Sequence, residues 1–279
     1  MTARGRWRTL NFGLRTILGL SEAGFFIPHR HAGLARTVEH NGYDALRPIF
    51  EARADAMRAF IAAIDGLAGD LDAIGGAPPP EPRFEQDWFP RLDAAALYTL
   101  VRAEAPARIL EIGSGHSTRF LARAVRDGGL STEIAAIDPK PRADISKLPV
   151  RLDLRTLQEA GKIGGDLAPG DLLMCDSSHV LMPGTDVDIV INRILPGLPS
   201  GVVVGFHDIF LPAAYPAAWP FTAYNEQLGV AALLQGGYEL VFSSAYALSA
   251  LREELDRTVI SRLPIQDGAR ESLILLRKL

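Results

Sequence analysis

The sequence contains a single cysteine and no long apolar run. Cys175 alone excludes an internal disulfide and fits a reducing compartment. No apolar stretch reaches the roughly 18–20 residues that a membrane-spanning helix needs. The N-terminus carries arginines, but Asn11, Gly13 and Arg15 interrupt its apolar residues, which makes a poor secretory signal. We therefore expect a cytoplasmic protein without a transmembrane segment.

A strong net charge is also absent. Lys and Arg total 29 against 33 Asp and Glu, and the formal net charge is -4 at pH 7, so the total favours no nucleic-acid partner. The first 40 residues differ, because they hold six arginines and two glutamates. Such an excess of arginine more often marks a solvent-exposed surface. The functional alternative is that these arginines contact a membrane surface or an acidic substrate.

Glycine and proline divide the chain near residue 78. Apolar residues recur at three- and four-residue steps from Tyr43 to Leu71, which predicts a helix. The run Gly-Gly-Ala-Pro-Pro-Pro at 75–80 ends that pattern. We expect residues 1–78 to form a helical N-terminal extension, as a lid or the surface of a homodimer, and residues 79–279 to form the main domain.

Predicted strands and helices alternate from Arg108 onward, which is the pattern of a parallel sheet with helices on both faces. A helix with an apolar stripe is expected from Val187 to Leu195. The fold class expected is therefore α/β, a Rossmann-like doubly wound sheet of seven strands whose ligands lie at the carboxyl ends of the strands. The candidate strands are 108–112, 133–138, 150–154, 171–176 and 201–206, with 238–242 and 272–276 as a late antiparallel pair.

The first of these strands runs into the motif Glu-x-Gly-x-Gly at residues 111–115. A turn without Cβ atoms lets the backbone approach a nucleotide-like ligand. The carboxylate of Glu111 would repel a pyrophosphate but not the cationic sulfonium and ammonium groups of S-adenosylmethionine. Thr118 stands where a dinucleotide fingerprint has its third glycine, which weakens that alternative without excluding it. We interpret Glu111, Gly113, Ser114 and Gly115 as residues that bind S-adenosylmethionine.

Two further residues are candidates for binding the adenosine part of this cofactor. Asp138 ends the second strand, where a carboxylate can accept hydrogen bonds from both ribose hydroxyls. An aspartate of a turn before Pro139 is the alternative. Gln158 follows the third strand and is predicted to hydrogen-bond the adenine, although a glutamine on the surface of a helix is about as common.

Titratable residues follow the fourth and fifth strands. Asp176 begins the run Asp-Ser-Ser-His at 176–179, and His207-Asp208 follows an apolar strand. Asp176 is expected where cofactor and substrate meet, whereas an Asx turn with the serines is the structural alternative. His207 has the ordinary pKa of a base that works at neutral pH. We assign His207, Asp176 and Asp208 to catalysis, and we expect His179 to be a surface residue unless it serves as a ligand or base.

Asp176 and Asp208 are also the candidate ligands of a hard divalent cation such as Mg²⁺, which would lower the pKa of a substrate hydroxyl. A hydrogen-bonded His-Asp pair without metal is the alternative. Aromatic side chains near these motifs are candidates for a pocket wall or for plain core. They are Trp88, Phe89, Tyr215, Trp219 and Phe221.

In combination these motifs resemble those of class I S-adenosylmethionine-dependent methyltransferases. The resemblance rests on Asp-Ser-Ser-His-Val at 176–180, His-Asp-Ile-Phe-Leu-Pro at 207–212 and Glu-Gln-Asp-Trp-Phe-Pro at 85–90. It covers roughly residues 84–245 and implies methyl transfer to an oxygen of a small molecule or sugar. Similar enzymes that act on catechols and macrolide sugars hold Mg²⁺ with acidic residues at these strand ends. Those enzymes usually have an acidic residue at the position that His207 occupies here.

Two other functions compete with this interpretation. An NAD-dependent oxidoreductase is disfavoured by Glu111, by the missing third glycine and by the absence of a Tyr-x-x-x-Lys pair. A non-catalytic module that binds S-adenosylmethionine would keep the glycine loop and lack a working base. The sequence does not identify the acceptor, although the arginines near the N-terminus favour an acidic or lipid-linked glycan.

Overall fold

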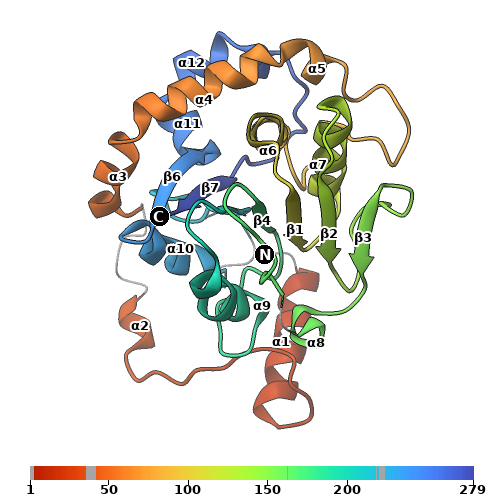
Figure 1. The fold of residues 1–279 in the computed structure, drawn as a ribbon. Helices are drawn as coiled ribbons and strands as arrows, with labels where there is room; N and C mark the ends of the chain where they lie inside the picture. Colours follow the sequence, from red (N-terminus) through yellow and green to blue (C-terminus); the bar gives the residue numbers. More distant parts are fainter. Residues whose placement is uncertain (1–2, 36–41, 162, 218, 220–223) are drawn as a thin grey trace. The chain divides into compact units, whose positions relative to one another are not determined.

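The computed structural model describes residues 3–35, 42–161, 163–217, 219 and 224–279 (Figure 1). The chain divides into two compact units. The smaller consists of Met1–Asn41 with Pro216–Thr222, and the larger of Gly42–Tyr215 with Ala223–Leu279. This division differs from the boundary expected at residue 78, because residues 42–78 belong to the larger unit.

The smaller unit contains the helices α1 (Ala3–Ile17) and α2 (Ala32–Ala35). Most of its described large apolar side chains are exposed to solvent, including Trp7, Leu10 and Phe25. In the described part of the chain, no helix has the length and apolar character needed to cross a membrane.

The larger unit is built on one seven-stranded sheet with the order β3-β2-β1-β4-β5-β7-β6. Its first five strands pair in parallel, whereas β7 is antiparallel to both β5 and β6. The predicted seven-strand Rossmann-like sheet is therefore confirmed, including its antiparallel last strand. The strands are β1 (Arg108–Ile112), β2 (Glu133–Ile137), β3 (Val150–Asp153), β4 (Leu172–Cys175), β5 (Val203–Phe206), β6 (Tyr238–Ser243) and β7 (Ile274–Lys278).

Helices cover the sheet of the larger unit on both faces (Figure 1). The chain runs from β1 to β2 in one direction and from β4 to β5 in the other, so right-handed crossovers place the connecting helices on opposite faces. The α-helices are α3 (Arg47–Glu51), α4 (Ala54–Gly66), α5 (Ala68–Asp72), α6 (Arg91–Glu104), α7 (His116–Asp127), α8 (Leu157–Ala160), α9 (Asp186–Ile189), α10 (Glu226–Leu234), α11 (Ser244–Ala250) and α12 (Arg252–Asp256).

The helix predicted from Tyr43 to Leu71 is divided into a 3₁₀ turn (Asp44–Leu46) and the helices α3, α4 and α5. Between α3 and α4, the guanidinium of Arg53 donates to the carbonyl of Leu240 and pairs with Glu239, both in β6. These contacts fix the chain at the break, and the apolar face of α4 packs into the core. Residues 42–78 are thus part of the sheet domain.

The helix expected at 187–195 is also irregular. α9 continues as a π-helical turn (Val190–Ile194) and a 3₁₀ turn (Leu195–Gly197). Pro196 lacks a backbone N–H and disfavours a regular continuation. The apolar stripe is nevertheless buried, since Val187, Val190 and Ile194 lie in the core.

The register of the sheet brings four strand ends to one edge. Ile112 at the end of β1 lies beside Ile137 of β2 and Cys175 of β4, and Cys175 lies beside Phe206 of β5. The residues that follow these strands therefore meet at one edge, where ligands of doubly wound sheets lie.

Candidate active site

The glycine loop packs against the end of β4. Gly113 has φ +83°, and a Cβ atom at this position would lie 1.8 Å from the carbonyl oxygen of Asp176. This part of the loop needs glycine for contact with the protein's own backbone rather than with a ligand. The contact fixes the loop after β1 against the residue that begins the Asp-Ser-Ser-His run.

Glu111 lies beneath this loop and is fully buried. Its carboxyl oxygens accept hydrogen bonds from the hydroxyls of Ser117 at 2.6 Å and Thr118 at 2.5 Å, in the first turn of α7. Burial raises the pKa of Glu111 to about 8, although the two hydroxyls oppose the shift. Both oxygens thus have partners within the protein, and a direct contact of Glu111 with the cofactor stays a prediction.

Asp138 also holds the glycine loop. One of its oxygens accepts from the backbone N–H of Ser114 at 2.7 Å and from the Ser114 hydroxyl at 3.1 Å, and the other accepts from the N–H of Lys140 at 2.7 Å. These bonds orient the carboxylate beside the loop, which is the position expected for a ribose contact. The contact itself is untested.

Gln158 is not among the residues that surround the cleft. It is exposed on the short helix α8, where its side-chain amide donates to the carbonyl of Gly184 at 3.1 Å. Its assignment to the adenine remains a prediction.

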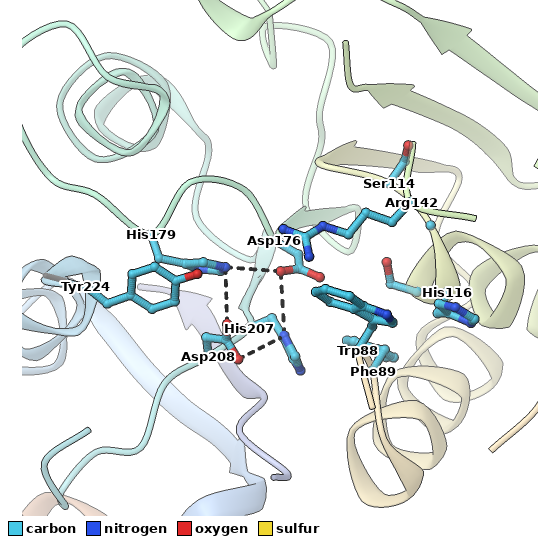
Figure 2. A pocket seen from close by; sticks show the side chains of 12 residues that line it. Trp88, Phe89, Ser114, His116, Arg142, Asp176, His179, His207, Asp208 and Tyr224 are labelled. Carbon is cyan, nitrogen blue, oxygen red and sulfur yellow. Dashed lines mark ion pairs between the residues drawn. The ribbon is translucent and has the colours of Figure 1, made fainter. Parts of the chain in front are cut away.

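A cleft opens between the glycine loop and the ends of β4 and β5, with a volume of about 460 Å³ counted with the space open to solvent. Figure 2 shows the side chains that line it. They are Ser114, Gly115, His116 and Ser117 at the loop, Asp176, His179, His207 and Asp208 beyond the strand ends, and Trp88, Phe89, Arg142 and Tyr224 around them.

A buried carboxylate contacts the His207 imidazole on the side away from the cleft. Its Nε2 lies 3.1 Å from Oδ2 of Asp93, in the first turn of α6. Asp93 is fully buried and also accepts hydrogen bonds from the backbone N–H groups of Ser272 and Leu273. These bonds fix the imidazole so that Nδ1 points toward the cleft.

His179 has an equivalent arrangement. Its Nδ1 lies 2.8 Å from Oε2 of Glu226, the first residue of α10, and both side chains are buried. The expectation of a surface histidine at this position is wrong. The run that follows Asp176 turns back into the protein, and the aromatic ring of Tyr224 covers the imidazole at 4.7 Å between centroids.

The other nitrogens of the two histidines converge on Asp176 and Asp208 (Figure 2). His179 Nε2 lies 3.4 Å from Asp176 and 3.3 Å from Asp208, and His207 Nδ1 lies 3.6 Å and 3.5 Å from the same two side chains. The structure thus brings together the three residues predicted for catalysis. We call Asp176, His179, His207 and Asp208 the histidine–carboxylate cluster.

The backbone of this cluster is unusual at two positions. His179 has φ 59° and Asp208 has φ 60°, which is the left-handed region that residues other than glycine rarely adopt. Of the described residues only Ala105 shares this feature. Strained backbone of this kind collects at functional sites, because the surrounding structure has to maintain it.

The charges in the cluster shift the pKa values of its members. Burial by itself lowers the pKa of His207, but Asp176, Asp208 and Asp93 raise it well above its ordinary value. For His179, hydrogen bonds with Asp176 and Glu226 overcome burial and raise the pKa to about 10. Both imidazoles are therefore protonated at neutral pH in the free protein.

The two aspartates respond in opposite directions. Burial favours the neutral form of Asp176, but His207 and His179 hold its pKa well below the usual range. Burial raises the pKa of Asp208 despite the same two imidazoles. Asp176 is thus the permanent anion at the centre of the cleft.

Aromatic rings and one guanidinium complete the lining. Phe89 packs against the His207 ring at 4.9 Å between centroids, and Arg142 lies over the ring of Trp88 at 4.1 Å. Of the other predicted wall residues, Tyr215 is not in the lining, Trp219 lies in the smaller unit, and Phe221 lies outside the described residues.

Two polar atoms beside the glycine loop are buried without a hydrogen-bond partner among the described residues. They are Nδ1 of His116, which lines the cleft, and the hydroxyl oxygen of Ser177. Burial, together with the charges of Arg119 and Arg83, lowers the pKa of His116 to about 4, so its imidazole is neutral. A buried polar atom without a partner is costly, and a polar ligand in the cleft would satisfy it.

The cluster does not fit a magnesium site. Magnesium prefers oxygen ligands, whereas two of the four side chains present imidazole nitrogens that already pair with the carboxylates. In the part of the chain that the structure describes, no group of three or more His, Cys, Asp or Glu side chains is arranged to hold a metal ion.

Sequence reasoning missed the residues that support the cluster. Asp93 and Glu226 belong to helix N-termini far from the strand ends in sequence, and Arg142 and Tyr224 lie in loops. One signal was available for Asp93, because a carboxylate within the otherwise apolar run Leu92–Leu97 is unlikely to be buried without a partner.

Comparison with known proteins agrees with this fold. Residues 110–209, from β1 to just beyond β5, match the family described as Methyltransferase domain. Together with the strand order of the sheet, this match supports the resemblance to class I methyltransferases. No curated protein matches the sequence significantly.

Several solved structures are similar at low identity. An O-methyltransferase from Bacillus cereus in complex with SAH is 13% identical, with 79% of this chain and 91% of that chain covered and a TM-score of 0.39. An SAH-bound methyltransferase from Podospora anserina is 16% identical, with 92% and 99% covered and a TM-score of 0.41. The O-methyltransferase TomG from Streptomyces achromogenes is 15% identical, with 78% and 89% covered and a TM-score of 0.38. At these scores the likenesses are too weak to transfer a function.

Proposed function

We propose that the protein transfers a methyl group from S-adenosylmethionine to a hydroxyl oxygen of a small molecule or sugar. The observation that carries this proposal is that one cleft joins the glycine loop to the histidine–carboxylate cluster. The first provides a place for the cofactor, and the second provides groups that can handle the proton of an acceptor hydroxyl.

The glycine-loop side fits the cofactor by its charge and its polar atoms. When bound, S-adenosylmethionine supplies a methyl carbon on a positively charged sulfur. Asp176 lies in the lining as a carboxylate and would stabilise a cation beside it. The neutral Nδ1 of His116 offers a hydrogen bond, and Asp138, held by Ser114, would accept hydrogen bonds from the ribose hydroxyls.

His207 is the residue that we assign to the acceptor's proton. Asp93 fixes the proton on Nε2, so Nδ1 faces the cleft and is the atom that accepts from a hydroxyl. The oxygen then uses its electron pair to form the bond to the methyl carbon, while the pair of the carbon–sulfur bond returns to sulfur. Asp93 is a positioning residue, because it acts through the imidazole.

The raised pKa of His207 gives this role a definite pH dependence. Only the unprotonated imidazole can accept a proton, and Asp176, Asp208 and Asp93 keep most of it protonated at neutral pH. The rate of methyl transfer should therefore increase as the pH rises above neutral. A rate that falls over that range would argue against His207 as the base.

The expected cation at Asp176 and Asp208 is the competing form of this proposal. Imidazole and carboxylate donors together favour a transition metal over Mg²⁺. If a metal is needed, a chelator should abolish methyl transfer. If His207 acts alone, a chelator should have no effect.

The first experiment is calorimetric titration of the protein with S-adenosylhomocysteine (SAH), carried out once with added Mg²⁺ and once with EDTA. Saturable binding in EDTA supports the cofactor assignment and directs effort to screening of hydroxylated acceptors. Methyl transfer that EDTA abolishes and a metal restores would favour the competing form. A folded sample that binds no SAH in any condition would contradict the proposal, and NAD would be titrated next. Binding without turnover of any acceptor would favour a non-catalytic module.

A further inference from the structure

Helix α1 presents an exposed apolar stripe. Trp7, Leu10, Leu14 and Ile17 recur at steps of three and four residues, which places them on one face of a helix. Their side chains are 72%, 59%, 49% and 60% exposed. Four large apolar side chains aligned in water are unfavourable, and exposed patches of this kind mark interaction sites.

Arginines accompany this stripe. α1 contains Arg4, Arg6, Arg8 and Arg15 and no acidic residue. Arg8 and Arg15 are exposed and seven residues apart, so they lie on a common face about 130° from the centre of the apolar stripe. A helix with an apolar face that includes tryptophan and leucine, flanked by arginines, is typical of helices that lie in the interface of a membrane.

Exposed apolar residues continue after the helix. They are Leu18, Leu20, Phe25, Phe26 and Ile27, each of them large and solvent-exposed. The larger unit has far fewer exposed large apolar side chains, and most of them are isolated, such as Leu154 and Leu228. The concentration of these residues in the first 27 positions is therefore a property of this segment rather than of the whole chain.

Other partners match only one of the two features. A second copy of α1 would cover the apolar stripe, but it would bring Arg8 and Arg15 near the same residues of the other copy, and α1 has no acidic residue to balance these charges. A nucleic acid would neutralise the arginines and leave Trp7 and the leucines in water. A bilayer with anionic headgroups satisfies both, because its acyl chains accept the stripe and its phosphates accept the guanidinium groups.

We propose that α1 binds reversibly to the surface of a bilayer that contains anionic phospholipids, with its axis in the membrane plane. Trp7, Leu10, Leu14 and Ile17 enter the boundary between headgroups and acyl chains, and Arg8 and Arg15 pair with lipid phosphates. This inference is independent of the proposed methyl transfer and would bring the enzyme to a surface that holds amphipathic acceptors.

Vesicle flotation of the full chain tests the proposal. We expect the protein to float with vesicles of phosphatidylcholine and phosphatidylglycerol at low salt, to float less as salt increases, and to stay in solution with phosphatidylcholine alone. The variant Arg8→Gln/Arg15→Gln should lower partitioning roughly 30-fold, about fivefold for each arginine. Leu10→Glu/Leu14→Glu should abolish it.

Matched controls make the same changes in the larger unit. Leu154→Glu adds a charge at an exposed leucine, and Arg252→Gln/Arg257→Gln removes two exposed arginines. Both should float like the wild-type chain, and all variants should keep its thermal unfolding midpoint. Failure of the wild-type chain to float, or flotation of Leu10→Glu/Leu14→Glu, would overturn the proposal. If the wild-type chain is instead a dimer that this variant converts to a monomer, the stripe binds a second copy.

Discussion

Both sides of the cleft contain carboxylates, which are buried on the glycine-loop side and partly buried on the histidine side, and the partners of these carboxylates differ in charge. On the glycine-loop side, Glu111 and Asp138 accept hydrogen bonds from hydroxyls and backbone amides, which are neutral. On the histidine side, Asp176 and Asp208 lie against imidazoles. The same residue type is therefore set to different states, because burial raises the pKa of Glu111 to about 8 while the imidazoles hold that of Asp176 low.

Neutral and charged partners of a carboxylate have different physical consequences. Neutral partners hold a loop in place at little electrostatic cost, and they keep its structure independent of the protonation of the cluster. Charged partners store protons within reach of a ligand. In the proposed function the glycine-loop side holds the cofactor, and the histidine side handles the proton of the acceptor.

Replacement of His207 by alanine should have the largest effect, and this effect should fall on the rate of methyl transfer rather than on cofactor binding. A positioned base contributes roughly 10²- to 10⁴-fold to a rate, so we expect His207→Ala to lose that factor in kcat. SAH affinity should change little, because the loop side keeps all its contacts. Steady-state kinetics and calorimetry measure both quantities, and unchanged kcat would refute the assignment.

Glu111→Gln should alter stability rather than chemistry. The folded protein holds the Glu111 proton up to about pH 8, whereas the unfolded chain releases it near the ordinary glutamate pKa of roughly 4.3. Between these values the folded state binds more protons, so the wild-type chain loses stability as the pH rises. Glutamine lacks this loss. We compare the free energy of unfolding of the variant with that of the wild type at each pH. The difference, variant minus wild type, should increase from pH 5 to pH 9 by an amount on the order of a few kcal/mol. Parallel pH profiles would show that Glu111 is not held neutral.

Asp93→Asn should shift the pH dependence of the reaction. Removal of one negative charge beside His207 lowers the pKa of the imidazole, so the rise of the rate should move about one pH unit toward acid. An effect on packing alone would lower kcat at all pH values without moving the profile. Thermal unfolding of the variant checks that the hydrogen bonds to Ser272 and Leu273 survive.

Gln158→Ala should have the smallest effect. A single neutral hydrogen bond to the adenine contributes about 1 kcal/mol, so loss of that contact should weaken SAH binding by less than about tenfold. The exposed Gln235→Ala serves as the control for an amide on the surface of a helix. Equal affinity in both variants would remove Gln158 from the cofactor site.

The fold and three of the four residues of the histidine–carboxylate cluster could be predicted from the sequence, whereas the residues that support the cluster could not. The apolar runs before Asp176 and His207 identify strands, and parallel strands bring their carboxyl ends to one edge, so the meeting of these residues follows from topology. Asp93 and Glu226 reach the same place from helices, and nothing in a linear pattern tells where a helix N-terminus will point. The burial of His179 could not be predicted, because the left-handed turn that points this side chain into the protein has no apolar periodicity.

The contact between Gly113 and the carbonyl of Asp176 also limits how the sequence can change. Any side chain at position 113 would displace the backbone that carries Asp176, and the two imidazoles that depend on this carboxylate would move with it. A directed-evolution library that varies the loop to accept an altered cofactor would therefore select against substitutions at 113 even where they improve binding. Changes that adapt the cofactor and acceptor sites of the proposed reaction would have to occur at Ser114, at Gly115 or at the aromatic rings that line the cleft, while Gly113 stays unchanged.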